Sequence, residues 1–262
     1  MTKKTYLLIA VALIANIPPA LAQNSPKTKP EETEVYEPVP PVITPGTSSS
    51  DAPSDAIILF NGKDLSEWVS TNNPEKPAQW IVKDGAITVK KGTGNIQTKR
   101  TFTDYQLHLE WKIPKVINGK GQGRGNSGLF LASIGPGDDG YEIQILDCYN
   151  NSTYSNGQTG SIYKQHIPLA NACKKPGEWQ TYDVIWTAPR FNEDGTLKSP
   201  ARVTAFHNGV LIQYYVEVKG KTVYIGDPSY EKAHGATPIK LQDHGDPSEP
   251  ISFKNIWIRE LK

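Results

Sequence analysis

Apolar and polar residues alternate in several short segments of the chain, which is the pattern of β-strands with one buried face. In residues 105–112, Leu107, Leu109 and Trp111 fall on one side of an extended chain and polar residues fall on the other. Because no window combines a helical period with matched caps, we expect an all-β domain. Further strands are predicted at residues 127–133, 180–186 and 251–261.

Two turns are specific enough to predict hairpins. Asp84-Gly85 and Asn208-Gly209 each separate two alternating segments, and both dipeptides tolerate the positive φ angles of a tight two-residue turn. Hairpins join antiparallel strands, and a domain of many short strands must bury one face of each sheet. The pattern therefore predicts a β-sandwich of two antiparallel sheets.

One predicted strand has a polar face with an unusual composition. Tyr141, Ile143 and Ile145 alternate with Glu142 and Gln144. Since side chains alternate across a strand, the apolar set packs into a core while the carboxyl and amide groups project together from the opposite side. A polar binding face on a sheet is built in this way.

The first 22 residues have the composition of a signal peptide. Lys3 and Lys4 precede an apolar stretch, and Ala20 and Ala22 supply the small residues of a cleavage site. We therefore expect a secreted or periplasmic protein whose mature chain begins near Gln23. No later segment is apolar for long enough to span a membrane, so no integral membrane segment is expected after cleavage.

Two further regions follow the signal peptide. Residues 23–56 are rich in Pro, Ser, Thr, Lys and Glu and contain few large apolar residues, which predicts a disordered linker. Residues 57–262 are long enough for a single large β-domain. This domain contains both cysteines, Cys148 and Cys173, and an even count in an exported chain favours a disulfide bridge between them.

The charge balance excludes one class of partner. The formal net charge is +1, from 28 basic and 27 acidic residues. Such a chain has no long-range field of one sign to attract a polyanion. We therefore expect neither a nucleic-acid partner nor binding to an anionic lipid surface.

Six short blocks of this chain occur in the order found in the 3-keto-disaccharide hydrolase family, which the chain resembles over essentially all of residues 57–262. The blocks are residues 59–68, 105–111, 125–131, 141–147, 178–180 and 239–245. The resemblance implies a concanavalin A-like jelly roll, an extracytoplasmic location and action on glycosides whose sugar is oxidised at C3. The oxidised carbohydrate is the expected substrate.

The resemblance also implies a route for the reaction. A ketone at C3 acidifies the hydrogen on C2, so that a positioned base removes it and forms an enolate. The enolate expels the group at C1, and water adds across the resulting double bond. Such a site needs a general base near C2, donors for the enolate oxygen and an acid for the leaving oxygen.

Three residues are candidates for catalysis. Glu142 is the first choice for general base or acid, because burial beneath a bound sugar raises the pKa of a carboxyl group toward neutrality. His244 lies in a polar turn after a short apolar run and suits a base or an enolate donor. Glu110, on the polar face of residues 105–112, would bracket the sugar with Glu142 if the two strands were neighbours.

The candidates for substrate binding share amide, guanidinium, carboxylate or aromatic groups near these positions. Gln144 shares the polar face of Glu142, and Asn126 and Arg124 belong to a glycine-rich stretch that allows close backbone approach. For several of them a structural role is an equally good interpretation, such as a turn-capping carboxylate or a tyrosine of the core. The full set is Gln144, Asp147, Arg124, Asn126, Tyr163 and Gln242.

No cofactor and no metal site are expected from the sequence. Asp138 and Asp139 offer oxygen ligands for a structural calcium ion, but they lack the regular spacing of a dedicated calcium loop. A solvated turn is the favoured interpretation of this segment. The oligomeric state and the leaving group of the substrate are left open by the sequence.

Two other function classes fit the same fold. Glu142, Gln144 and Asp147 resemble the Glu-x-Asp-x-x-Glu strand of retaining glucanases with a jelly roll, although the middle acid is a glutamine here and the last is an aspartate. A non-catalytic carbohydrate-binding module is the other alternative, because sandwiches of this kind bind glycans without acting on them.

Overall fold

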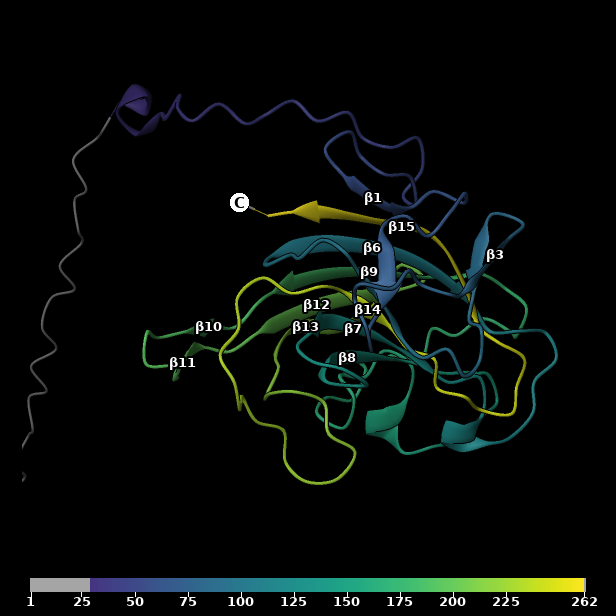
Figure 1. The fold of residues 1–262 in the computed structure, drawn as a ribbon. Coiled ribbons are helices and arrows are strands. Elements are labelled where there is room, and N and C mark those ends of the chain that lie inside the picture. The colour runs from purple at the N-terminus through teal and green to yellow at the C-terminus, as the bar shows by residue number, and fades with distance from the viewer. Residues whose placement is uncertain (1–28, 262) are drawn as a thin grey trace, which may run out of the picture. The chain divides into compact units, whose positions relative to one another are not determined.

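Antiparallel strands are the main regular structure of the computed structural model, which describes residues 29–261 (Figure 1). The larger sheet has eight strands in the order β13-β12-β9-β6-β15-β4-β3, with β1 also paired to β15. Its strands are β1 (Ile57–Phe60), β3 (Ile81–Lys83), β4 (Ala86–Thr88), β6 (Tyr105–Lys112), β9 (Gln180–Thr187), β12 (Arg202–His207), β13 (Val210–Glu217) and β15 (Ser252–Glu260).

The smaller sheet has five strands in the order β2-β5-β14-β7-β8. A separate ribbon pairs β10 (Arg190–Phe191) with β11 (Leu197–Ser199). Short 3-10 turns occur at η1 (Pro30–Thr33), η2 (Gly121–Gly123) and η3 (Ser155–Gly157). The strands of the smaller sheet are β2 (Trp68–Ser70), β5 (Ile96–Thr98), β7 (Ser127–Ser133), β8 (Gly140–Ile145) and β14 (Lys240–Leu241).

The predicted fold class is confirmed: the domain is a concanavalin A-like jelly-roll sandwich of two antiparallel sheets. Both predicted hairpins form, β3–β4 and β12–β13, and their turns contain Asp84 and Asn208 at φ angles of 51° and 52°. Positive φ at both turn residues gives these turns the twist that the flanking strands require.

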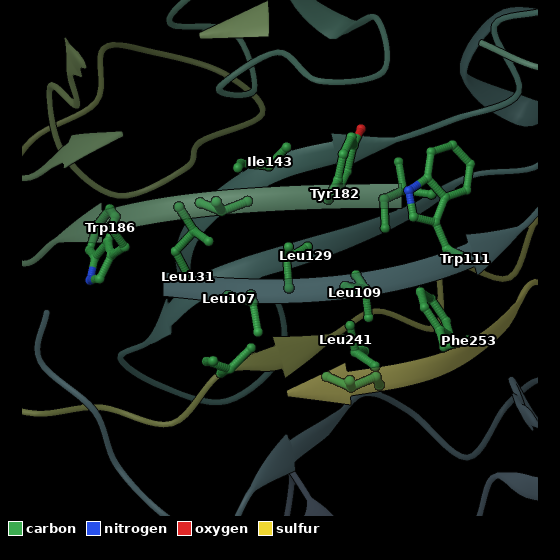
Figure 2. Packing of buried hydrophobic residues seen from close by; sticks show 14 of the residues in the cluster. Leu107, Leu109, Trp111, Leu129, Leu131, Ile143, Tyr182, Trp186, Leu241 and Phe253 are labelled. Carbon is green, nitrogen blue, oxygen red and sulfur yellow. The ribbon is translucent and has the colours of Figure 1, made fainter. Parts of the chain in front are cut away.

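The core lies between the facing sides of the two sheets. Figure 2 shows Leu107 and Leu109 of β6 in the same packed layer as Leu129 and Leu131 of β7. Two buried tyrosines of the larger sheet also connect the layers. Tyr105 Oη donates to the carbonyl of Leu131 at 2.6 Å, and Tyr182 Oη donates to the carbonyl of Gln144 in β8 at 2.7 Å. Large side chains thereby fill the core without leaving their polar ends unpaired.

The expected linker is only partly separate from the domain. Residues 29–42 are all exposed, but the compact unit of the sandwich begins at Ile43 rather than at residue 57. The carbonyl of Ser50 accepts hydrogen bonds from Asn255 Nδ2 at 2.7 Å and from Trp257 Nε1 at 3.0 Å. Residues 43–56 are therefore ordered on the outer face of β15, because outward side chains of that strand offer donors. The expected signal peptide and residues 23–28 lie outside the described residues.

The predicted disulfide is confirmed. Cys148 and Cys173 are bonded, with 6.0 Å between their Cα atoms, and the bond closes a loop of 25 residues just beyond β8. Within residues 29–261, no helix is long and apolar enough to cross a membrane.

Candidate active site

The polar face of β8 lines a cavity of about 270 Å³, as the alternation of its sequence predicts. Tyr141, Ile143 and Ile145 belong to the core, so Glu142 and Gln144 project from the opposite face. Six of the sequence-predicted site residues meet at this cavity. They are Asn126, Glu142, Gln144, Tyr163, Gln242 and His244.

Strand pairing explains why residues distant in the sequence converge here. Asn126 immediately precedes β7, and Gln242 and His244 follow β14, which pairs with β7. The pairing continues past the strand end, since the backbone N–H of Gln242 donates to the carbonyl of Gly128 at 3.1 Å. The start of β7, the end of β14 and the polar face of β8 thus bring their side chains to one side of the smaller sheet.

Glu142 has a buried carboxyl group that faces the cavity. Its side chain is only 5% exposed, and within residues 29–261 no hydrogen bond from another side chain reaches its oxygens. Burial raises the pKa of Glu142 to about 8, the negative charge of Asp138 adds to this increase, and the ammonium of Lys240 opposes it. A carboxyl group in this state is able to exchange a proton near neutral pH.

His244 is oriented by an amide. Asn126 Nδ2 donates one hydrogen to the carbonyl of Gln122 at 2.7 Å and lies 3.1 Å from His244 Nε2. Because this nitrogen has only hydrogens to offer, Nε2 is the acceptor, and the proton of the neutral imidazole is on Nδ1. His244 is therefore arranged to donate through Nδ1–H. The adjacent Asp243 makes no hydrogen bond to the imidazole among the described residues, and its Oδ2 accepts from the backbone N–H groups of Gly92 and Gly94 at 2.8 and 3.2 Å.

A second amide pair supports the base of the cavity. Gln144 Nε2 donates to Gln122 Oε1 at 2.8 Å, while Gln144 Oε1 has no partner among the described residues. The side-chain oxygens of Asn126 and Gln242 are likewise buried without a partner in this part of the chain. Unpaired buried acceptors around one cavity suit a ligand that carries several hydroxyl donors.

Asp138 reaches the cavity because its loop is wrapped around an internal cation. Lys240 is completely buried, and its Nζ donates to the carbonyls of Gly135, Gly137 and Asp139 at 3.1, 2.8 and 2.8 Å. The ammonium thus holds the aspartate-containing loop for which a calcium ion was considered. Among residues 29–261, no group of three His, Cys, Asp or Glu side chains is placed to hold a metal ion.

Two predicted substrate-binding residues bind each other instead of lining the cavity. Arg124 Nε donates to Asp147 Oδ2 at 2.7 Å, and its guanidinium also reaches the carbonyl of Tyr149. Asp147 is 2% exposed and accepts the backbone N–H of Tyr149 as well. Their ion pair holds the turn after β8, and the last acid of the glucanase-like pattern is therefore absent from the site.

The expectation that Glu110 brackets the sugar is wrong on geometry. Its strand, β6, pairs with β15 and β9 in the larger sheet and not with β8. Glu110 lies on the outer face of that sheet, where it pairs with Lys254 at 3.2 Å and accepts from Asn255 at 3.0 Å. Alternation placed it correctly on a polar face, but of the other sheet.

Four residues of the cavity were not predicted as binding residues. Gln122, Asp138, Thr222 and Tyr224 also line it. Thr222 and Tyr224 come from the long connection between β13 and β14, which carries no regular pattern. Thr222 Oγ1 accepts the backbone N–H of Glu142 at 3.0 Å, so this connection is fixed directly against the catalytic candidate.

Comparison with known proteins decides the family. A model of the 3-keto-α-glucoside-1,2-lyase-like domain matches residues 55–259. The chain belongs to this family. The match confirms the resemblance carried by the six sequence blocks and, with the structures described next, supports a carbohydrate-active enzyme.

Solved structures agree with this assignment. A crystal structure described as a "putative glycosyl hydrolase" from Parabacteroides distasonis ATCC 8503 is 57% identical, covers 89% of this chain and 97% of its own, and superposes with a TM-score of 0.82. Two further glycosyl hydrolase structures from that organism, with the same qualified description, are each 23% identical and cover 79% of this chain. They cover 94% and 99% of their own chains, with TM-scores of 0.54 and 0.56. These two show the shared fold. No curated protein matches the chain.

Proposed function

We propose that this family member cleaves glycosides whose sugar ring carries a ketone at C3, by elimination across C1–C2 followed by addition of water. The observation that carries the proposal is Glu142: a buried carboxyl group, free of side-chain donors among the described residues, at the wall of a cavity suited to one sugar ring. A base of this kind removes a proton from carbon more readily than a solvated carboxylate.

The geometry of the cavity supports one assignment of roles within this proposal. Ionised Glu142 takes the C2 proton, and the C–H electron pair forms the C2=C3 bond of an enolate whose charge lies on the C3 oxygen. The Nδ1–H of neutral His244 donates to that oxygen, and the amide groups of Gln144 and Gln242 bind ring hydroxyls. The enolate then re-forms the ketone and a C1=C2 bond as the C1–O bond breaks. The departing oxygen takes up the proton that Glu142 removed, which returns Glu142 to its ionised state, and water adds with its hydroxyl at C1 and its hydrogen at C2.

A paired substrate experiment tests the proposal. The full-length protein is incubated with a disaccharide and with the same disaccharide oxidised at C3, and released sugar is measured by chromatography. We expect release from the keto form alone. In D₂O, elimination and re-addition place deuterium at C2 of the product, whereas direct displacement at C1 leaves hydrogen there. Borohydride quenching at early times and an enzyme-free incubation of the product control for spontaneous exchange.

A conventional glycosidase is the second candidate, and Asp138 is the observation that favours it. This carboxylate lines the same cavity and raises the pKa of Glu142, as paired acids of glycosidases do. Turnover of the unoxidised disaccharide without deuterium at C2 would establish this route and overturn the elimination. Binding of either sugar without turnover would instead indicate a carbohydrate-binding module.

An extracytoplasmic location is part of the proposal. The signal-peptide composition of residues 1–22 supports it, and so does the Cys148–Cys173 bond, since disulfides persist in oxidising compartments. Detection of the processed protein in the periplasmic or secreted fraction, with an N-terminus near Gln23, checks this point. An unprocessed chain in the cytoplasmic fraction would contradict it.

A further inference from the structure

A second cavity of about 490 Å³ adjoins the first. The two share Gln122, Asn126, Tyr163, Tyr224 and His244 among their lining residues, so a ligand in the first continues into the second past the imidazole. The mechanism above uses only the first cavity, which receives the oxidised sugar ring. The second is the adjoining space that is open to the group leaving from C1.

Three tyrosines give the second cavity its character. Tyr154, Tyr163 and Tyr224, here called the tyrosine platform, all line it. The rings of Tyr154 and Tyr163 meet at 63° with centroids 6.3 Å apart, and their hydroxyls are hydrogen-bonded at 2.6 Å. Any side chain at Gly157 would collide with the Tyr154 ring, so glycine at that position gives this ring its room. Two of the three rings are therefore held in place before a ligand arrives.

A lysine joins the third ring to the other two. Lys164 Nζ lies 4.1 Å from the ring centroid of Tyr224 and 5.6 and 5.8 Å from those of Tyr154 and Tyr163. The same ammonium donates to the backbone carbonyl of Tyr224. These contacts attach the connection between β13 and β14 to the segment after β8, and they assemble the platform from separate parts of the chain.

The platform exposes an aromatic surface that folding does not use. Tyr224 is 71% exposed although it borders both cavities. Several polar groups on the platform side of the second cavity are already engaged: Gln122 Nε2 donates to Thr153 and to the carbonyl of Gly157, and the hydroxyls of Tyr154 and Tyr163 bind each other. A surface of this composition suits the apolar face of a ring better than a chain of hydroxyl groups.

We propose that the tyrosine platform binds the ring of the leaving group, so that the enzyme selects glycosides whose C1 substituent is itself a ring with an apolar face. This rests on the proposed function. Both a second sugar ring and an aromatic ring present such a face. Tyr224 is the specificity-determining residue, because it is the most exposed member of the platform and borders both cavities.

The test compares three 3-keto-α-glucosides that differ only in the C1 substituent: methyl, phenyl and glucosyl. We expect Tyr224→Ala to lower kcat/KM for the phenyl and glucosyl compounds at least tenfold more than for the methyl compound, mainly through KM. Tyr224→Phe should retain most of the discrimination, because the aromatic face remains. Tyr214→Ala is the matched control: Tyr214 is 72% exposed and belongs to β13, away from both cavities.

The outcomes separate this proposal from the one beneath it. A larger loss for the phenyl compound assigns the platform to aromatic leaving groups, and a larger loss for the glucosyl compound assigns it to sugars. An equal loss of kcat/KM for all three substrates, or no loss, would disprove the proposed role of the tyrosine platform but would not affect the proposed function. If the wild-type enzyme converts none of the three substrates, the proposed function is disproved, and so is the role of the tyrosine platform that depends on it.

Discussion

The carboxyl group of Glu142 lies directly against the backbone of Gly128 on the neighbouring strand. A β-carbon added to Gly128 would be 2.5 Å from Glu142 Oε1 and 3.0 Å from its Cδ. Pairing of β7 with β8 creates this contact: Gly128 is opposite Gln144 and Phe130 is opposite Glu142, so Gly128 is the diagonal neighbour of Glu142 on the same face of the sheet. The absence of a side chain at Gly128 thus provides the space that the Glu142 carboxyl group occupies.

Gly128→Ala should therefore displace the Glu142 carboxyl group. We expect a loss of kcat on the order of 10²-fold, because misplacing a reacting group by about 1 Å has effects of this size. Steady-state kinetics with a 3-keto-glycoside measure it, and thermal unfolding checks the fold. Gly235→Ala is the control, since nothing lies within 4 Å of a β-carbon there. Unchanged kcat in Gly128→Ala would show that the position of this carboxyl group is not critical.

Glu142→Gln should remove turnover while preserving the fold. The amide has the same shape but cannot take the C2 proton, so kcat should fall about 10²–10⁴-fold. Glu110→Gln is the matched control, because Glu110 occupies a strand of the other sheet and faces away from the cavity. Near-normal turnover in Glu142→Gln would remove this residue from catalysis.

The same variant has a predictable effect on stability. The pKa of Glu142 is about 8 in the folded protein against 4.5 for an unperturbed group, so the folded state binds more protons than the unfolded state between these values. The free energy of unfolding of the wild type should therefore fall relative to Glu142→Gln as pH rises from about 4.5 to about 8. Urea unfolding at several pH values measures this difference, and a constant difference would contradict the buried, protonated state.

The pH dependence of activity should report the same group. If ionised Glu142 is the base, kcat/KM rises with pH and levels off above its pKa of about 8. Asp138 raises that pKa, so Asp138→Asn should move the rising limb to lower pH. Asp139→Asn is a matched control from the same loop, because Asp139 lies outside the cavity. A limb that stays in place would show that Asp138 does not act on Glu142.

The sequence predicted those parts of the site that follow from local alternation. Glu142 and Gln144 are predictable because side chains alternate every two residues along a strand. This alternation places them on the face opposite Tyr141 and Ile143, independently of how the strands are arranged. The same rule placed Glu110 on a polar face, but alternation cannot say which sheet a strand joins. That information lies in pairings between strands far apart in the chain, which a single sequence does not reveal.

Side chains outside regular strands were harder to place. Arg124 and Asp147 have the chemistry of ligand-binding residues, yet they satisfy each other at 2.7 Å, and only coordinates show this. Tyr224 was missed for the converse reason: the connection that carries it has no repeating pattern, and its position depends on the contacts of Lys164 and Thr222. Patterns predict faces of strands, whereas loop positions depend on tertiary contacts.

The disulfide should contribute to stability rather than to chemistry. Neither cysteine of the Cys148–Cys173 bond lines a cavity, although the loop of 25 residues that the bond closes carries Tyr154 and Tyr163. Replacing both cysteines with serine should lower the free energy of unfolding by about 3 kcal/mol, because the unfolded chain regains the entropy of that loop. Urea unfolding of the variant and of the wild type, each with and without reductant, measures this. Reductant should affect only the wild type, and an equal response of both proteins would contradict the prediction.

Lys240 should be essential for the loop that carries Asp138. Its ammonium is the donor for three loop carbonyls in a fully buried position, so Lys240→Met leaves those carbonyls without their partner. We expect a loss of about 3 kcal/mol in the free energy of unfolding, from the 1–3 kcal/mol that each unsatisfied group costs when partial hydration is allowed for. Lys221→Met is the matched control: its partly exposed ammonium pairs with Glu231 at 2.7 Å, and exposed pairs of this kind contribute little to stability. Equal losses of unfolding free energy in the two variants would mean that the hydrogen bonds from Lys240 to the three carbonyls do not hold the loop.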